Sequence, residues 1–274
     1  MSARTRLRRE SILARIYEQG HVMVKDLARE MGSSESTIRR DLRALSDERA
    51  LELVHGGAVL GHGNDLSFRS KSMRNVEAKR IIGRLAAELV SDGDQILLDS
   101  GTTCFQMAPF LRSKRGLLVI VNSTRLAMEL NASGLSVILL GGQYRPPRMD
   151  TIGPLATAAL DQLRGYLLFI GADGLSADFG LTAGDIDSAD LYRRAVGNAR
   201  ETVLLADHSK FQTPSLFKIV GFDAISRIVT DREPSTQWME FLESRKIQVI
   251  YPREGSDQGK RDGPEGPTAK SQRS

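Results

Sequence analysis

A short apolar run followed directly by a loop of small polar residues recurs along the C-terminal part of the chain, and this pattern constrains the fold most strongly. The runs are 96–98, 117–121, 137–140, 166–170 and 203–206, with helix-like stretches between them. Short strands that alternate with helices predict βαβ units around a mostly parallel sheet. The sequence therefore predicts an α/β domain over residues 74–252.

The loops that follow these runs contain the side chains expected to bind a ligand. In open α/β sheets, ligands bind beyond the carboxyl ends of the strands, and glycine-rich loops before helices present backbone N–H groups to anions. Lys210 and Arg145 are the cations best placed to neutralise a phosphate. We expect a polyol-phosphate pocket formed by Ser100, Gly101, Thr102, Thr103, Asn122, Ser123, Gly141, Gly142, Arg145, Gly171, Asp173, Gly174, Asp207, Ser209 and Lys210.

Residues 1–60 have a different texture, with short helical patterns separated by single glycines. Apolar spacing predicts a first helix that ends near Gly20 and a second that ends at Gly32. Val22 and Val24 alternate with less apolar residues, which predicts a short strand between the two helices.

A third helix in this region has two contrasting faces. Ile38, Leu42 and Leu45 fall at i, i+4 and i+7 and form a buried stripe, while Ser33 or Ser34 can cap the helix. The face opposite the stripe, with its flanks, carries Ser36, Thr37, Arg39, Arg40 and Arg43. Arginine can bridge guanine O6 and N7, so this helix suits insertion into the DNA major groove.

A hairpin is expected next. Leu51 and Leu53 alternate with polar residues, Gly56 and Gly57 supply a tight turn, and Val59 begins a return strand. The three helices and this hairpin predict a winged helix-turn-helix domain that binds double-stranded DNA.

Two motifs in this domain resemble the signature of the DeoR family of transcriptional regulators. They are Ser36-Thr37-Ile38-Arg39-Arg40-Asp41-Leu42 and Val54-His55-Gly56-Gly57-Ala58. The resemblance extends over roughly 4–231, through segments 75–80, 99–103, 141–145, 171–174, 180–182 and 207–211.

The resemblance implies an α/β domain similar to ribose-5-phosphate isomerases and CoA-transferases, with a phosphorylated sugar as inducer. It also implies a repressor of sugar-metabolism genes, with Ser34 among the DNA-facing residues and His55 in the wing. The chain departs from the family pattern in the wing, where a glycine is usual near Arg49 and a basic residue near Glu52 and Leu53. Val121 likewise stands where threonine is common.

Composition narrows the remaining possibilities. The net charge of +4 gives only a mild bias towards anionic partners, and the one cysteine, Cys104, excludes an internal disulfide. Apolar runs are far shorter than the roughly 20 residues that span a bilayer. We expect a cytoplasmic protein with no membrane contact, no metal, and no cofactor besides the phosphorylated sugar ligand. Segment 61–73 is expected to be a linker, and 253–274 a disordered tail.

Two other functions compete with this interpretation. In a sugar-phosphate isomerase-like enzyme with an appended nucleic-acid-binding module, Asp173, Asp207 and Lys210 could serve as acid, base and phosphate clamp. A DNA-reading module would be idle on such an enzyme, and Gly174 stands where the similar isomerases carry a second carboxylate. A nucleic-acid-packaging protein is disfavoured because the basic residues are interleaved with acids.

The size of the DNA-reading helix also bears on assembly. One short helix reads too few base pairs for useful affinity, so helix-turn-helix proteins commonly bind paired half-sites. We therefore expect a homo-oligomer held together by the C-terminal domain.

Overall fold

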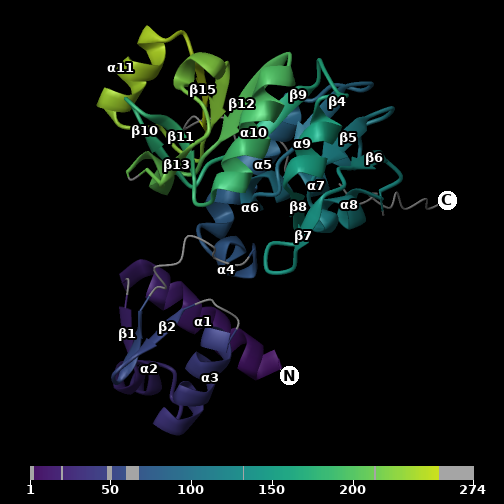
Figure 1. Cartoon of the computed structure of the whole chain (residues 1–274). Helices are drawn as coiled ribbons and strands as arrows, with labels where there is room; N and C mark the ends of the chain where they lie inside the picture. The colour runs from purple at the N-terminus through teal and green to yellow at the C-terminus, as the bar shows by residue number, and fades with distance from the viewer. Residues whose placement is uncertain are drawn as a thin grey trace, which may run out of the picture.

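The computed structural model describes residues 3–19, 21–47, 51–59, 68–131, 133–212 and 214–252 (Figure 1). The N-terminal domain contains α1 (Ala3–Gln19), β1 (His21–Met23), α2 (Val24–Glu30), α3 (Glu35–Asp47), β2 (Glu52–Val54) and β3 (Gly57–Val59). The strands form an antiparallel sheet in the order β1-β3-β2. This arrangement is the predicted winged helix-turn-helix.

The core of this domain confirms the predicted stripe on α3. Ile38, Leu42 and Leu45 are buried and pack with Ile12 and Ile16 of α1. Because α3 supplies one face to this core, its opposite face is left to solvent. The backbone N–H of Thr37 donates to Oγ of Ser34, 3.3 Å away, so Ser34 caps the helix as expected.

The wing differs from the prediction in two details. Val24 does not extend the first strand but begins α2, and the return strand starts at Gly57 rather than at Val59. A side chain at Gly57 could not be accommodated, because its Cβ would lie 2.1 Å from the carbonyl oxygen of Val22 on the paired strand. Glycine is therefore required at this position, where β3 pairs with β1.

One charged residue of α3 lies inside the domain. Asp41 is 2% exposed and accepts hydrogen bonds from Nε of Arg8, at 2.6 Å, and from Nε of Arg9, at 3.0 Å. Both arginines belong to α1, so these ion pairs fix the angle between α1 and α3.

The second domain contains the predicted parallel sheet. Its helices are α4 (Phe68–Ser72), α5 (Val76–Glu88), α6 (Thr102–Phe105), α7 (Ala108–Leu111), α8 (Thr124–Asn131), α9 (Pro154–Leu160), α10 (Ile186–Asn198), α11 (Thr236–Ser244), η1 (His208–Phe211) and η2 (Phe222–Ala224). Its strands are β4 (Gln95–Leu98), β5 (Leu118–Val121), β6 (Ser136–Leu139), β7 (Gln143–Arg145), β8 (Asp150–Ile152), β9 (Leu167–Gly171), β10 (Gly174–Ser176), β11 (Gly180–Ala183), β12 (Glu201–Leu205), β13 (Phe217–Lys218), β14 (Arg227–Val229) and β15 (Gln248–Ile250). The central strands run parallel in the order β15-β14-β12-β9-β4-β5-β6.

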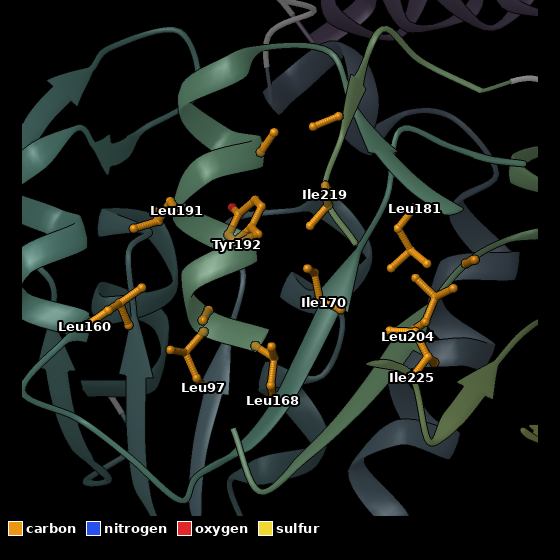
Figure 2. Close-up of a cluster of buried hydrophobic side chains, with 14 of the residues drawn as sticks. Leu97, Leu160, Leu168, Ile170, Leu181, Leu191, Tyr192, Leu204, Ile219 and Ile225 are labelled. Carbon is orange, nitrogen blue, oxygen red and sulfur yellow. The ribbon is translucent and has the colours of Figure 1, made fainter. Parts of the chain in front are cut away.

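Each central strand contributes to the core on both faces of the sheet, because successive side chains point to opposite sides. Leu97, Leu168 and Leu204 pack under α10 and α9 in the cluster of Figure 2. Their neighbours Leu98 and Phe169 instead join the cluster on the other face, which is covered by α5 and α7. A sheet buried on both faces explains why these strands read as continuous apolar runs.

Two expectations for this domain are corrected. The helix-like stretch between the runs 96–98 and 117–121 does not form one helix but divides into α6 and α7. Part of the expected linker is also structured, because α4 lies within 61–73 and packs on the α/β domain. The Phe68 ring contacts that of Phe105 edge to face at 5.4 Å, and the Phe68 N–H donates to the carbonyl of Pro147. Residues 61–67 and the expected tail, 253–274, lie outside the described residues.

Candidate functional site

The polar face of α3 is presented to solvent as the sequence indicates. Ser36, Arg39, Arg40 and Arg43 are exposed. Nη2 of Arg39 is 2.8 Å from Oε2 of Glu35 one turn earlier, which orients that guanidinium along the helix. The hydroxyl of Ser34 is 2.9 Å from those of Ser36 and Thr37 and also serves the helix cap. Ser34 thus has a structural role besides the expected DNA contact.

A groove of about 360 Å³ separates α3 from the wing. Arg39 and Arg43 line it from the helix, and His55 lines it from the hairpin turn. The structure thus brings together expected DNA-contacting residues from two separate motifs. The wing presents Glu52, Leu53 and Val54, all exposed, as its outer strand. Arg49 lies outside the described residues.

The α/β domain holds a cavity of about 400 Å³ beyond the carboxyl ends of β4, β9 and β12. Many of the residues expected to bind a ligand line this cavity. They are Ser100, Gly101, Thr102, Thr103, Gly171, Asp173, Asp207, Ser209 and Lys210. Loops that are far apart in the sequence meet here because β4, β9 and β12 are neighbours in the sheet.

The remaining expected residues do not line this cavity: Asn122, Ser123, Gly141, Gly142, Arg145 and Gly174. The β7–β8 hairpin covers the end of β5, where the Thr151 N–H donates to the carbonyl of Asn122 and Ser123 bridges to Asp150. The side chain of Asn122 in turn donates to the carbonyl of Thr151. Gly174 is paired with Thr182 in the β10–β11 ladder.

Arg145 is the clearest departure from expectation. The sequence predicts that it neutralises a phosphate, but its guanidinium binds both carboxylate oxygens of Asp150 and Oδ1 of Asp185, each at 2.8 Å. Asp150 also accepts from the hydroxyl of Ser100, at 2.9 Å. Arg145 therefore supports the cavity loop through Asp150.

Several cavity residues are not among those expected from the sequence. Lys71, Arg74, Asn75, Lys79, Arg148 and Tyr192 all line the cavity. One of them carries a signal that sequence reasoning could use. Lys79 falls on the apolar stripe of α5 with Ile82, Gly83 and Ala86, and a lysine on a buried stripe indicates an interior polar site.

Burial and close charges shift the titration of these groups. Burial lowers the pKa of Lys79 to about 7, and its Nζ donates to the carbonyl of Lys71. Burial also lowers the pKa of Lys210. Burial alone would raise the pKa of Asp173, but Lys71, whose Nζ is 2.7 Å away, together with Lys210 and Arg148 lowers it to about 2.

The other acids of the cavity order its loops. Asp99 accepts from the N–H of Gly101 at 2.7 Å and from that of Gly171 at 2.5 Å, which ties the loop after β4 to β9. Burial raises the pKa of Asp99. Oδ1 of Asp207 accepts from the side-chain amide of Asn75 at 2.9 Å and from the N–H of Ser209 at 3.0 Å. These carboxylates are engaged with protein donors.

The cavity is suited to a small anion that carries hydroxyl groups. Lys71, Arg74, Arg148 and Lys210 supply positive charge, and the first N–H groups of α6 have no acceptor within that helix. Hydroxyl and carboxylate side chains supply hydrogen-bond partners for a polyol. Among the described residues, no group of His, Cys, Asp and Glu could hold a metal ion.

A winged helix-turn-helix with an arginine-rich α3, joined to an α/β domain with a cationic cavity, defines a class of ligand-responsive DNA-binding proteins. Comparison with known families agrees. Residues 8–63 match the DeoR-like helix-turn-helix domain, and residues 74–232 match the DeoR C terminal sensor domain. The chain belongs to the DeoR family of transcriptional regulators, which confirms the resemblance seen in the sequence.

Relatives in this family match over most of their length. The HTH-type transcriptional regulator GlpR of Haloferax volcanii is 32% identical over 245 residues, covering 89% of this chain and 96% of the relative. The putative aga operon transcriptional repressor of Escherichia coli O157:H7 is 32% identical over 248 residues, covering 89% and 92%. The HTH-type transcriptional repressor CsqR of Escherichia coli K12 is 28% identical, covering 90% and 95%.

Solved structures match part of the chain. Ribose 5-phosphate isomerase A from Methanocaldococcus jannaschii covers 50% of this chain and 55% of its own, with 21% identity and a TM-score of 0.37. The tetrameric eIF2B-beta2-delta2 complex from C. thermophilum covers 57% and 56%, with 18% identity and a TM-score of 0.44. In the part of the chain that the structure describes, no helix is both long enough and apolar enough to cross a membrane.

Proposed function

We propose that this protein represses sugar-metabolism genes and that a phosphorylated sugar releases it from its operator. The observation that carries the proposal is the cavity of about 400 Å³, where Lys71, Arg148 and Lys210 line the wall together with the loop at the start of α6. A cavity of this size suits a small ligand. A phosphate ester places its anion among cations and N–H groups, and its hydroxyls reach Asp207 and Ser209.

The DNA side of the proposal rests on the groove between α3 and the wing. Arg40 and Arg43 are exposed on the face opposite the buried stripe, and Arg43 and His55 line the groove. We propose that α3 enters the major groove, with the wing along the backbone. Exposed Leu53 and Val54 occupy the outer strand of the wing, so its contribution to phosphate binding is small.

The cavity favours sensing over catalysis. An isomerase needs a carboxylate that accepts a carbon-bound proton near neutral pH. Oδ2 of Asp173 accepts from the N–H of Gly184, and in the ligand-free cavity Lys71, with Lys210 and Arg148, lowers the pKa of Asp173 to about 2, which makes it a weak base. Asp207 accepts from Asn75 and Ser209. Burial alone would raise the pKa of Asp207, but Lys210, Ser209 and Lys79 together lower it. We propose that the protein binds its sugar phosphate without converting it.

We further propose that the protein works as a homo-oligomer in the cytoplasm, where both DNA and sugar phosphates occur. Oligomerisation is supported by β6, which pairs with β5 on one side and is an edge of the described sheet. Its side chains Ile138 and Leu139 are exposed. An apolar edge strand is a template for pairing with a second copy. We expect the full-length protein to be dimeric or larger by light scattering, and Leu139→Lys to lower its mass. An unchanged mass in Leu139→Lys would place the interface elsewhere, and a monomeric wild type would contradict oligomerisation.

The proposal is tested in two stages. DNA fragments retained by the purified protein are first sequenced to define an operator. Sugar phosphates and their parent sugars are then compared by thermal shift and by release of that operator. We expect one phosphorylated sugar to stabilise the protein and weaken operator binding by roughly five- to 150-fold, a usual range for allosteric coupling. Equal effects of the parent sugar would rule out phosphate sensing, and turnover of a panel member would favour the isomerase-like enzyme.

A further inference from the structure

We propose that Lys71, on the short helix between the two domains, binds the ligand phosphate directly and that losing its ion pair with Asp173 shifts α4 and weakens DNA binding. This inference rests on the proposed function and adds a route from cavity to DNA. It also places a ligand-binding residue upstream of the matched sensor domain, which begins at residue 74.

Helix α4, Phe68–Ser72, follows directly on residues 60–67, which connect it to β3 of the wing. Figure 1 shows α4 beside α6 at the end of the α/β domain nearest the N-terminal domain. Lys71 and Phe68 line the ligand cavity. The chain segment that leads to the DNA-binding domain therefore forms part of the cavity wall.

Contacts at both ends hold α4 in place. On the cavity side, Nζ of Lys71 is 2.7 Å from Oδ1 of Asp173, and the carbonyl of Lys71 accepts from Nζ of Lys79. At its other end, Phe68 donates its N–H to Pro147 and has the Arg125 guanidinium 4.5 Å from its ring centre. Two of the contacts of α4 are thus made by lysine side chains that a bound anion would attract.

Of the two partners in this ion pair, Asp173 is the more firmly held. Oδ2 of Asp173 accepts from the N–H of Gly184 at 2.8 Å, and the backbone N–H of Asp173 donates to Thr182 in β11. Asp173 is therefore fixed to the β10–β11 ladder. Lys71 lies on a helix of little more than one turn and reaches Asp173 through a long, flexible side chain. The lysine is the more mobile partner.

A phosphate ester carries about −1.5 to −2 charges at neutral pH and accepts several hydrogen bonds, so it competes with the single charge of Asp173 for Lys71. Asp173 also repels the anion, which favours a position from which Lys71 is drawn away from the carboxylate. When Lys71 leaves Asp173, α4 loses a contact that joins it to the β10–β11 ladder, and α4 is the helix that follows the interdomain segment.

The test uses full-length protein with Lys71→Met, with Lys71→Arg as the charge-conserving variant and Arg80→Met as the control. Arg80 is an exposed cation on α5 that pairs with Glu77, and it does not line the cavity. Binding of inorganic phosphate and of the sugar phosphates is measured by titration calorimetry, and operator release by retardation assay. We expect Lys71→Met to bind phosphate about tenfold to a hundredfold more weakly, the usual effect of losing one charged hydrogen bond.

The responses separate this inference from the proposed function. If wild type and Arg80→Met neither bind a phosphorylated ligand nor release operator, the proposed function fails. If they do both, and Lys71→Met binds phosphate equally well or releases operator by the same factor at saturation, the role of Lys71 is refuted. Lys71→Arg should retain part of the phosphate affinity.

A second measurement needs no variant and remains valid if Lys71→Met fails to fold. Amide hydrogen exchange over residues 68–72 is compared in wild-type protein with and without a phosphorylated ligand. We expect faster exchange at α4 with ligand, because the contacts that hold the helix change. Unchanged exchange at α4, together with slower exchange at the loop after β4, would show that the ligand binds without moving this helix and would overturn the inference.

Discussion

The guanidinium of Arg145 donates to both carboxylate oxygens of Asp150, and the carboxylate is completely buried. Asp150 in turn accepts from the Ser100 hydroxyl, which is 2.8 Å from the hydroxyl of Tyr192 on α10. A chain of polar contacts that runs from Arg145 through Asp150 to Ser100 thus holds the loop at the start of α6 in place. The sequence predicts that Arg145 contacts a ligand phosphate. In the structure Arg145 instead supports the loop that would bind the phosphate.

The first prediction follows from this burial. Arg145→Met leaves a fully buried carboxylate without its bidentate partner, and we expect the free energy of unfolding to fall by about 3–5 kcal/mol. The measurement is urea unfolding followed by the fluorescence of Trp238, the single tryptophan, which lies in the α/β domain. Arg84→Met serves as control, because its partner Glu88 is exposed and such pairs are worth about 0.5 kcal/mol. Equal stability of the two variants would contradict a supporting role for Arg145.

The second prediction concerns DNA recognition. Arg40→Ala and Arg43→Ala should each weaken operator binding by about 1–3 kcal/mol if the arginine reads a base, with relaxed preference at one position. An arginine that contacts only phosphate should weaken binding to all sequences alike and lower the salt slope by about one. Both side chains are exposed, so thermal stability should be unchanged. Retardation assays with selected and scrambled operators provide the measurement, and wild-type binding by both variants would show that α3 does not face DNA.

The third prediction concerns Lys210, which lines the cavity with its Nζ 3.4 Å from the carbonyl of Asp173. Lys210→Ala removes a cation from the cavity but leaves the DNA-binding domain intact. We expect normal operator affinity and loss of the response to sugar phosphate, measured by retardation with and without ligand. A full response in Lys210→Ala would place the phosphate away from this lysine.

The fourth prediction is a pH dependence. A lysine in the unfolded chain has a pKa of 10.5, and burial lowers the pKa of Lys79 to about 7 in the folded protein because it disfavours the charged form. Below pH 7 both states hold the proton, and the folded state bears the full cost of burying the charge. Between pH 7 and 10.5 the folded protein has released the proton while the unfolded chain still holds it, so stability rises with pH by up to about 1.4 kcal/mol per unit.

Lys79→Met should remove this rise and should be more stable than wild type at pH 6. Arg80→Met, at the neighbouring exposed position, should keep the rise. Urea unfolding between pH 6 and pH 9, followed by Trp238 fluorescence, measures the difference. Parallel curves for wild type and Lys79→Met would show that Lys79 does not titrate in this range. At the acidic end, Asp173 contributes stability that is lost as the pH falls from 3.8 towards about 2.

Local periodicity explains which parts of the fold the sequence predicts. The stripe of Ile38, Leu42 and Leu45 and the apolar runs that become β4, β5, β6, β9 and β12 are patterns within single elements. The break between α6 and α7 also has a local signal, because Pro109 in the first turn of α7 has no N–H for a continuous helix. The packing at the break is different. Gly83 of α5 packs against the backbone of Gln106 so closely that a Cβ there would lie 2.5 Å from it, and no local pattern signals this contact between distant segments.

The residues of the cavity also divide into those that local patterns predict and those that depend on contacts between distant segments. The loops after β4, β9 and β12 are predictable because strand ends are recognisable and neighbouring parallel strands end together. Arg148 lines the cavity in place of the expected Arg145. Which of the two does so depends on how the β7–β8 hairpin turns, because both belong to one short segment. The sequence does not identify Lys71 as a cavity residue, because Lys71 precedes the α/β pattern and reaches the cavity only through the packing of α4.

The hydrogen bonds of the cavity carboxylates have a further consequence for how a signal is detected. Asp207 accepts from Asn75 and Ser209, and Asp173 accepts from the N–H of Gly184 as well as pairing with Lys71, so both carboxylates are engaged with protein donors rather than placed to take a proton from a sugar carbon. On the proposed function, the sugar phosphate leaves the cavity chemically unchanged and can bind again to another copy. Occupancy then follows the concentration of the metabolite rather than its rate of consumption, and the regulator does not deplete the pool that it monitors.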